Sequence, residues 1–353
     1  MEVALSGTGR IGRLFLRKVF IENSPVVKVT TINTSASPAL LAHLLQYDTV
    51  HGYWAAEITE WEQGIVVNGQ PIRLVSQRSP ELLDWQERGS PLVIDATGKF
   101  NNRQGAQQHI AAGARAVLIT APGPDLDLTV VMGVNEGQYD PEQHQLVSAA
   151  SCTTNCLVPV LDIMDRAFGI EQGWMTTVHA YTNDQNHLDN SHADLRRARS
   201  CTQSIIPAST GVRKALSGVL PHLADRVQGQ AVRVPTADVS LLDLQLQLQK
   251  PVISVDKLQE VFREAASGAY RHYVGYNELP LVSADYIGND KSATVDGLSF
   301  MVNRGQVKLM AWYDNEWAYA CRVFDLAAYM IARMKGEDGG NKGQSSLLFQ
   351  KLG

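Results

Sequence analysis

The first half of the chain alternates short apolar runs with stretches of helical periodicity. A helical pattern over 10–20 follows the first apolar run, and Ser37-Pro38 supplies an N-cap and a first-turn residue for a second helix. Buried strands are predicted over 2–6, 26–33, 91–98, 116–123, 128–134 and 145–150. Strands that alternate with helices in this way are typical of a parallel sheet built from βαβ units.

After residue 150 the pattern changes to strands with one apolar and one polar face. Leu alternates with Gln over 239–249, so we expect one face of this strand to be buried. Two apolar runs flank Asn68-Gly69 and two more flank Arg304-Gly305, and both arrangements predict hairpins. A long amphipathic helix is expected from about 316 to 334. The second half is therefore predicted to be α+β, with a mainly antiparallel sheet and helices on one face.

A glycine motif stands between the first predicted strand and its helix. The sequence "SGTGRIGR" contains Gly7-x-Gly9-x-x-Gly12. The first glycine permits a tight turn, the second lets the backbone approach a pyrophosphate, and the third allows close packing of helix and strand. The helix N-terminus adds N–H donors and a positive dipole end. The motif alone often marks only a turn, but its place inside a βαβ unit favours dinucleotide binding.

The end of the second predicted strand lacks a carboxylate. An acidic residue there would hold the adenosine ribose hydroxyls, but the chain has Thr34, Ser35 and Ser37. A carboxylate would repel the 2′-phosphate of NADP, whereas hydroxyls before a helix N-terminus would tolerate it. We expect NADP to be accepted; the alternative is that Thr34 is an ordinary turn residue and that NAD binds.

These patterns divide the chain of 353 residues, which is too long for one ordinary core, into two domains. Residues 1–150 are expected to form a Rossmann-type α/β domain that binds NAD(P), rejoined by the helix at about 316–334. Residues 151–315 are expected to form the α+β catalytic domain. The Gly-rich, polar segment 335–353 is expected to be a flexible tail.

Composition narrows the class of protein without naming an activity. A formal net charge of −5 gives no reason to expect nucleic acid as the main ligand. No segment is long and apolar enough to span a bilayer, and "MEVALSGTGRIGR" does not have the pattern of a signal peptide. Four cysteines make no disulfide framework, so we expect a reducing cytoplasm with free thiols.

Two cysteines open an apolar run in "SCTTNCLVPVLDIM". If Ser151 caps a helix there, Cys152 lies at its positive end, and the dipole and a nearby imidazole would lower the thiol pKa from its usual ~8.5. Cys156 follows one turn later, and Pro159 is expected to kink the helix or delay its ordered part. A metal site is not expected, because no second Cys/His pair has ligand spacing. A buried, inert thiol is the alternative for either cysteine.

A histidine and an arginine complete the candidate chemistry. His179 ends the β-like run "WMTTVH", three residues before Thr182. A single histidine is usually structural, but a Cys–His pair downstream of a dinucleotide loop favours an acid/base role. Arg233 in "VRVPT" is a candidate phosphate ligand through its planar guanidinium; the alternative is a surface or ion-paired arginine.

The motifs "ASCTTNC", "TTVHAYTNDQ", "SIIPASTG", "VRVPTADVS" and "WYDNEWAY" closely resemble those of phosphorylating glyceraldehyde-3-phosphate dehydrogenases, and the resemblance runs from "GRIGR" to the last helix. The segments "INTSASPALLAHLLQYDTVHG" and "HLDNSHADLRRARSCTQSIIP" resemble the bacterial branch that prefers NADP and works in the gluconeogenic direction. In that family, NAD-selective members have Asp in place of Thr34. They commonly have Leu-Pro in place of Asn190-Ser191, a segment that reaches the adenosine end from a neighbouring subunit.

The resemblance implies a role for individual residues. Cys152 would be the nucleophile and His179 the acid/base that activates it. The phosphate groups of the substrate and of inorganic phosphate would be held by Ser151, Thr153, Thr182, Arg197, Thr210, Gly211 and Arg233. The cofactor would be held by Gly7, Gly9, Arg10, Ile11, Gly12, Thr34, Arg78, Thr97, Thr120, Ser191 and Asn315, the last through the nicotinamide amide. The family usually has Asn and Phe in place of Ser6 and Thr8.

The resemblance also implies the reaction and the assembly. The Cys152 thiolate would attack D-glyceraldehyde 3-phosphate, hydride would pass to the nicotinamide, and phosphate would cleave the resulting thioester to 1,3-bisphosphoglycerate. A homotetramer is implied, with no metal and no membrane partner. Two alternatives stay open: an erythrose-4-phosphate dehydrogenase, whose members tend to lack "HAYTND", and a non-catalytic NAD(P)-binding interaction protein.

Overall fold

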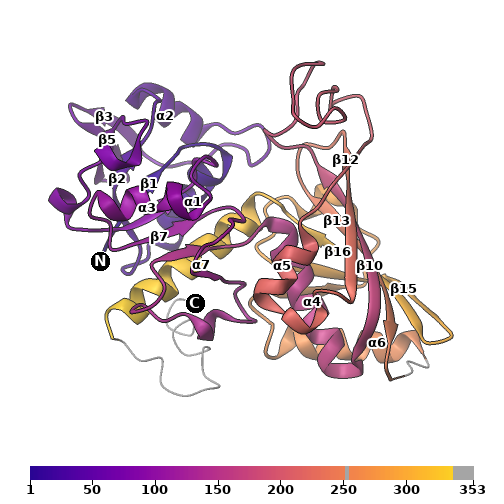
Figure 1. Ribbon diagram of the computed structural model, residues 1–353. Helices are drawn as coiled ribbons and strands as arrows, with labels where there is room; N and C mark the ends of the chain where they lie inside the picture. Colours follow the sequence, from indigo (N-terminus) through magenta and orange to yellow (C-terminus); the bar gives the residue numbers. More distant parts are fainter. Residues whose placement is uncertain (251–253, 337–353) are drawn as a thin grey trace. The chain divides into compact units, whose positions relative to one another are not determined.

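The computed structural model describes residues 1–250 and 254–336, and the chain divides into two compact units (Figure 1). Met1–Val130, Glu136–Ala150 and the chain from Ala320 form the first unit, and Val131–Asn135 with Ser151–Tyr319 form the second. All but the first two residues of the predicted tail 335–353 lie outside the described residues.

The first unit is built on a nine-stranded sheet with the order β3-β4-β5-β2-β1-β6-β7-β9-β8. Its strands are β1 (Glu2–Ser6), β2 (Lys28–Asn33), β3 (Ile58–Trp61), β4 (Gly64–Val67), β5 (Gln70–Val75), β6 (Leu92–Asp95), β7 (Ala116–Ile119), β8 (Leu128–Thr129) and β9 (Leu146–Ser148). Following this spatial order, every neighbouring pair from β5 onward is parallel. Only β3–β4 and β4–β5 are antiparallel. The predicted Rossmann-type α/β fold is confirmed.

Local sequence signals account for several of these elements. The unit's helices are α1 (Arg10–Glu22), α2 (Pro38–Gln46), α3 (Arg103–Ala111) and most of α7 (Trp317–Met334). Ser37 caps α2 by accepting a hydrogen bond from the Leu40 N–H, as predicted. Asn68 and Gly69 have φ values of 48° and 79° and close the tight turn between β4 and β5, which confirms that hairpin.

Several predicted strands of this unit are shorter than expected: β6 covers only Leu92–Asp95 of 91–98 and β7 only Ala116–Ile119 of 116–123. The largest difference is in the run 128–134. The apolar run 128–134 forms strand only over Leu128–Thr129. The Asn135 side chain accepts a hydrogen bond from the Val131 N–H at 2.8 Å, and the Val134 N–H bonds back to the Val131 carbonyl. These local bonds turn the backbone away from the sheet, so hydrophobic residues that read as a strand form a turn instead.

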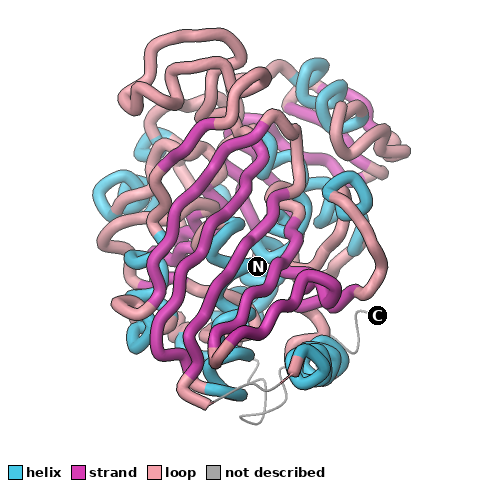
Figure 2. Tube along the Cα trace, turned by 90° about the vertical axis from the view of Figure 1, so that its right-hand side faces the viewer, coloured by secondary structure: helices cyan, strands magenta, loops and turns pink. Residues whose placement is uncertain are grey.

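The second unit holds a seven-stranded sheet with the order β11-β12-β10-β13-β16-β15-β14, seen face-on in Figure 2. Its strands are β10 (Ile170–Ala180), β11 (Ile206–Ala208), β12 (Val227–Val234), β13 (Ser240–Leu248), β14 (Val274–Asn277), β15 (Ala293–Asn303) and β16 (Gln306–Tyr313). Only β10–β12 and β14–β15 are parallel. The prediction of a mainly antiparallel sheet is confirmed.

Helices cover one face of this sheet. They are α4 (Cys152–Phe168), α5 (Val212–Val219) and α6 (Val255–Ser267), which pack on strands from β10 to β16. Leu242, Leu244, Leu246 and Leu248 of β13 are buried in this core, while Gln245 on the other face is exposed, as the alternation predicted. Arg304 and Gly305 make the predicted turn of the β15–β16 hairpin, with φ values of 46° and 83°.

The helix that carries Cys152 is ordered from its first residue. α4 begins at Cys152 and continues through Pro159, so the predicted late start is wrong. Every residue from Thr153 to Met164 is buried. Burial along a whole helix outweighs the roughly 3 kcal/mol that an interior proline costs. No helix in the described ranges is both long and apolar enough to cross a membrane.

Candidate active site

The glycine loop after β1 has the geometry of a dinucleotide-binding turn. Gly7 has a φ of 98°, and a Cβ there would lie 2.7 Å from the backbone of Ala96 and Thr97. A Cβ on Gly12 would lie 2.1 Å from the Gly7 carbonyl oxygen. Gly9 is the N-cap residue of α1, and a Cβ there would meet no atom within 4 Å. The two outer glycines are thus required by packing, and the central one leaves open space where a pyrophosphate would approach the helix.

Five of the predicted cofactor residues gather at one edge of the first sheet. Gly7, Thr34, Arg78, Thr97 and Thr120 each follow the carboxyl end of a strand, and these strands are neighbours in the order β5-β2-β1-β6-β7. The carboxyl edge of an open parallel sheet is where such folds bind ligands. Topology therefore brings together residues that the sequence spreads over more than a hundred positions.

At the end of β2, Thr34 is buried and hydrogen-bonded. Its hydroxyl lies 2.6 Å from the hydroxyl of Thr8 in the glycine loop, and it accepts a hydrogen bond from the Ala36 N–H at 3.0 Å. No carboxylate occupies this position, as expected from the sequence. Thr8, which sequence reasoning noted only as a departure from the family, is thereby part of the same hydroxyl pair.

The other predicted cofactor residues of α1 have different surroundings. Ile11 lies in the first turn, and Arg10 pairs with Asp48 through both guanidinium nitrogens. Burial alone would raise the pKa of Asp48, but the bonds from Arg10 and from the His51 and Val50 N–H groups outweigh it and hold this pKa far below its ordinary value. Arg10 is thus fixed as part of an ion pair at the start of α1.

Two predicted cofactor residues belong to the second unit. Ser191 is exposed in the loop after β10, and its N–H donates to the Asn190 side chain at 2.7 Å. Asn315 follows β16 and is buried, and its side-chain oxygen accepts a hydrogen bond from the Ser240 hydroxyl at 2.7 Å. This bond leaves the amide N–H groups of Asn315 as the donors it would present to a ligand.

Cys152 and His179 meet within the second unit. Ser151 caps α4 as predicted, its hydroxyl accepting a hydrogen bond from the Thr154 N–H at 3.0 Å. This cap places Cys152 at the first helical position. Its Sγ lies 3.4 Å from Nε2 of His179, near the end of β10. A thiol at a helix N-terminus beside an imidazole is the arrangement of an activated nucleophile and its base.

The other ring nitrogen of His179 fixes the orientation of the imidazole. Nδ1 lies 2.7 Å from the Ala180 carbonyl oxygen and 2.7 Å from Nη1 of Arg233, which also donates to that carbonyl at 2.9 Å. The Ala180 carbonyl calls for a proton on Nδ1, whereas the Arg233 guanidinium, which can only donate, calls for a lone pair there, so the two contacts favour different tautomers. In the tautomer with the proton on Nδ1, the lone pair of Nε2 faces Sγ. That tautomer lets His179 take the thiol proton.

Burial governs the ionisation of this pair. It raises the pKa of the Cys152 thiol, although Arg233 and hydrogen bonds from Thr153 oppose the change. It also lowers the pKa of His179 to about 3, with Arg233 as the next cause. The predicted net lowering of the thiol pKa is therefore wrong. Each shift opposes one charge formed alone, whereas proton transfer from Sγ to Nε2 creates two opposite charges that stabilise each other.

Arg233 is the described guanidinium best prepared for an anion. Register pairs it with His179 across β10 and β12. Its Nε is buried without a hydrogen-bond partner, and it makes no ion pair with any carboxylate in residues 1–250 and 254–336. Arg197, by contrast, pairs with Asp184 and lies 3.6 Å from a carboxylate oxygen of Asp194. A buried guanidinium whose Nε has no hydrogen-bond partner and which pairs with no described carboxylate fits a phosphate group.

The predicted phosphate ligands with hydroxyl groups are not all alike. The Thr153 hydroxyl is hydrogen-bonded to Tyr313 at 2.9 Å, and that of Thr182 lies 3.3 Å from the Gln185 side chain. Thr210 and Gly211 precede α5, and Thr210 lines a hollow of about 350 Å³ near the start of that helix. No described contact joins Thr210 or Gly211 to the Cys152–His179 pair.

Sequence reasoning missed the role of Tyr313. Its hydroxyl bonds to Thr153 at 2.9 Å and to Thr177 at 2.7 Å, and its ring packs edge-on against the imidazole of His179. Tyr313, at the end of β16, thus connects this strand with α4 and β10 beside the Cys152–His179 pair. The only signal in the sequence was its place in the motif "WYDNEWAY".

Cys156 fits the alternative interpretation of the segment around Cys152, in which a cysteine is a buried and inert thiol. It is fully buried on α4, and burial raises its pKa well above the ordinary value. None of the four cysteines, all of which lie in the described residues, forms a disulfide.

Comparisons with known proteins agree with this geometry. Residues 1–103 match the glyceraldehyde 3-phosphate dehydrogenase NAD binding domain, and residues 151–315 match the C-terminal domain of the same enzyme. The chain is 50% identical over 336 residues to glyceraldehyde-3-phosphate dehydrogenase 2 of Bacillus subtilis, covering 95% of this chain and 98% of the relative. It is 47% identical over 333 residues to glyceraldehyde-3-phosphate dehydrogenase 1 of Bacillus cereus, covering 94% and 99%. The chain therefore belongs to the glyceraldehyde 3-phosphate dehydrogenase family and is an NAD(P)-dependent oxidoreductase that acts on an aldehyde group.

Proposed function

We propose that this phosphorylating glyceraldehyde-3-phosphate dehydrogenase accepts NADP and prefers it to NAD. The observation that carries the proposal is the hydroxyl pair of Thr8 and Thr34 at the end of β2, 2.6 Å apart, where a carboxylate would exclude a 2′-phosphate. Whichever hydroxyl donates to the other, one O–H proton is left for a ligand. The 2′-phosphate can accept a hydrogen bond from this O–H group. An Asp carboxylate at this position has no proton to donate, and its negative charge would repel the phosphate.

Steady-state kinetics with each cofactor tests this preference. We expect kcat/KM with glyceraldehyde 3-phosphate and phosphate to be higher for NADP than for NAD. Thr34→Asp should change the ratio by at least about tenfold in favour of NAD, because it places two like charges together. Thr34→Asn, which has the same shape without the charge, is the matched control and should change the ratio less. Equal ratios in the wild type and Thr34→Asp would contradict the proposal.

The contacts of Cys152, His179 and Arg233 in the second unit support a catalytic role for each of them. Cys152 attacks the aldehyde carbon while His179 takes the thiol proton through Nε2, 3.4 Å from Sγ. Arg233 supplies its buried guanidinium to a phosphate group. The dinucleotide, held by the glycine loop and the strand ends of the first unit, supplies the acceptor for the aldehyde hydride. His179 then returns its proton as the acyl group leaves sulfur for inorganic phosphate.

Phosphate dependence separates this function from its alternatives. We expect aldehyde oxidation to turn over only when inorganic phosphate is present, since phosphate releases the acyl group from Cys152. Activity that is indifferent to phosphate and favours erythrose 4-phosphate would point to the erythrose-4-phosphate dehydrogenase. A Cys152→Ala variant that lost turnover but kept the full biological effect would point to a non-catalytic binding protein.

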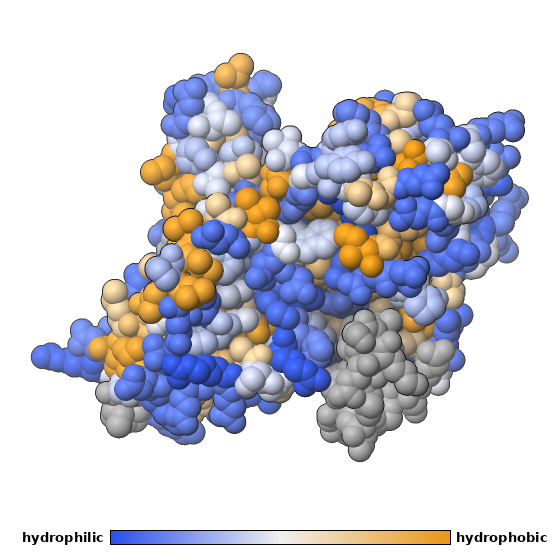
Figure 3. All heavy atoms as spheres, turned by 180° about the vertical axis from the view of Figure 1, so that it is seen from behind, coloured by the Kyte–Doolittle hydropathy of each residue, from blue (hydrophilic) through white to orange (hydrophobic). Residues whose placement is uncertain are grey.

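We also propose a homotetramer in the cytoplasm. The sheet face opposite α4 exposes large apolar side chains, among them Trp174 on β10 at 63% and Met301 on β15 at 62%. Figure 3 shows apolar surface interspersed with polar surface in the view from behind. Apolar residues exposed on a flat sheet favour contact with further copies of the chain. Sedimentation equilibrium should give four times the chain mass, and a monomer would contradict this. The absence of disulfides among the described cysteines suits a reducing compartment.

A further inference from the structure

A buried line of hydrogen bonds runs from Trp85 to Thr97 within the first unit. Nε1 of Trp85 donates to Nδ1 of His109 at 3.0 Å, and Nε2 of His109 lies 3.2 Å from a carboxylate oxygen of Asp95. The other Asp95 oxygen accepts from the backbone N–H of Thr97 at 2.8 Å and from its hydroxyl at 2.6 Å. Trp85, His109 and Asp95 are at most 1% exposed, and none of the roles given above uses them.

The direction of every bond in this line is determined. An indole nitrogen can only donate, so Nδ1 of His109 has to accept. The ring proton therefore sits on Nε2 and is donated to Asp95. A doubly protonated imidazole would set two donors against each other at Trp85, so the buried ring is neutral. Asp95, which accepts all three bonds, is held as the acceptor at the centre of the line.

These directions decide what Thr97 can offer a ligand. Its single hydroxyl proton is donated to Asp95, so its oxygen can only accept. The Lys99 N–H takes one position on that oxygen at 3.2 Å, which leaves one lone pair. The pyrophosphate bridge of a dinucleotide carries no donor at neutral pH, so it cannot bond to this oxygen. A hydroxyl group can.

The same carboxylate residue joins two loops at the ligand edge of the sheet. Thr97 follows β6, and its backbone nitrogen would lie 2.7 Å from a Cβ on Gly7 of the glycine loop. The carbonyl of Asp95 accepts a hydrogen bond from the N–H of Thr120, which follows β7. Asp95 therefore fixes the loops after both strands beside the turn expected to receive the pyrophosphate.

We propose that Trp85, His109 and Asp95 are positioning residues that hold Thr97 as a hydrogen-bond acceptor for a ribose hydroxyl of the dinucleotide. Ribose hydroxyls are the donors adjacent to the pyrophosphate in either cofactor. The inference rests on the proposed function only in taking this sheet edge as the dinucleotide site. It requires no preference between NAD and NADP, and both cofactors should depend on the line to the same extent.

Three variants of the intact enzyme test the proposal. His109→Leu removes the hydrogen-bond donor to Asp95. Asp95→Asn leaves one acceptor oxygen, although the donors of His109 and Thr97 use both carboxylate oxygens. His109→Gln keeps an amide oxygen for Trp85 and an amide N–H for Asp95. Calorimetric titration without substrate should show that the first two weaken NAD and NADP binding by about tenfold each, as for a lost hydrogen bond to a ligand. His109→Gln should stay within about threefold of wild type.

A control separates positioning from general loss of stability. Leu146→Ala opens a cavity in the cluster of Ala106, Val117, Ile119 and Leu146 in the same unit. It should lower the unfolding midpoint and leave the dissociation constants of both cofactors unchanged. In the variants of the line, the KM for cofactor should rise while kcat at saturating cofactor and the KM for glyceraldehyde 3-phosphate stay within about twofold.

The outcomes are distinct. If His109→Leu does not fold, Asp95→Asn decides the question by the same titration. Unchanged cofactor affinity in Asp95→Asn, or equal losses in His109→Gln and His109→Leu, would overturn the proposal. An equal loss of affinity in Leu146→Ala would overturn it too. Because binding is measured without turnover, a failure of the proposed reaction would appear in the activity assay and not in these titrations.

Discussion

At the scale of single residues, the Cys152–His179 pair is expected to work by the exchange of one proton between a half-buried thiol and a buried imidazole. Burial raises the pKa of Cys152 and lowers that of His179, so neither charge is favoured alone. The 3.4 Å contact lets both charges form together. The thiolate therefore depends on its base more than on the helix end, and removing the imidazole should expose that dependence.

His179→Asn is expected to lower kcat by about 10²- to 10⁴-fold, the usual contribution of a general base. It should also move the alkylation of Cys152 by iodoacetamide to higher pH, because the thiolate loses its counter-charge. The pH profile of alkylation and steady-state turnover measure the two effects. His222→Asn is the matched control, since His222 is exposed and pairs with Asp165. Equal losses in both variants would contradict the assignment.

At the scale of elements, the cap of α4 connects helix stability to the nucleophile. Ser151→Ala removes the bond to the Thr154 N–H and should lower the free energy of unfolding by about 1 kcal/mol. It should also slow the alkylation of Cys152, which stands at the first helical position. Ser254→Ala removes the equivalent cap of α6, whose Lys257 N–H bonds to Ser254. That control should cost similar stability with unchanged alkylation; a parallel slowing in both would contradict the link.

The helices and strands differ in how far they could be predicted from the sequence. The central strands β1, β6 and β7 of the first unit were predictable because both faces are buried and the runs are continuously apolar, and the caps and turns carry their own side-chain signals. The Cys–His pair was found through motifs of a known family. The bond from Thr153 to Tyr313 was not, since it joins residues 160 positions apart and exists only because β16 lies two strands from β10. α6 was missed, although Ser254 begins it with an ordinary cap.

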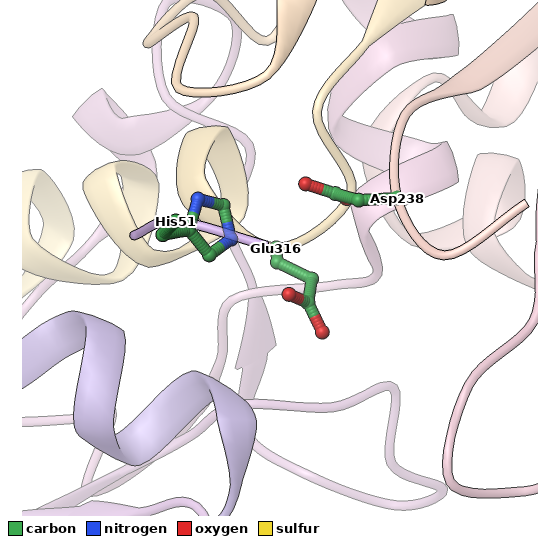
Figure 4. A group of neighbouring side chains, drawn as sticks. All are labelled: His51, Asp238 and Glu316. Atoms are coloured by element: carbon green, nitrogen blue, oxygen red, sulfur yellow. The ribbon is translucent and has the colours of Figure 1, made fainter. Parts of the chain in front are cut away.

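At the scale of the whole molecule, two buried ionisable groups, His179 and Asp238, make the free energy of unfolding change with pH in opposite directions. His179 has a pKa lowered to about 3, so the unfolded chain binds its proton first, and stability is lost as pH falls below 6.5. Asp238, drawn as sticks in Figure 4, behaves in the opposite way. Burial and the nearby carboxylates of Asp314 and Glu316 raise its pKa. Its stabilising contribution is therefore present below the ordinary pKa of 3.8 and lost as pH rises.

Asp238→Asn should then stabilise the protein at alkaline pH. The amide keeps the shape of the protonated carboxyl without the cost of ionising a buried group beside two other carboxylates. We expect the free energy of unfolding to rise by about 1–2 kcal/mol at pH 8 and to change by less than about 0.5 kcal/mol at pH 4, where the wild-type carboxyl already holds its proton. Denaturant unfolding at the two pH values measures this. Asp243→Asn, at a half-buried carboxylate paired with Lys308, is the control and should not stabilise at pH 8. A gain that is the same at pH 4 and pH 8 would mean that packing, and not ionisation, distinguishes the variant.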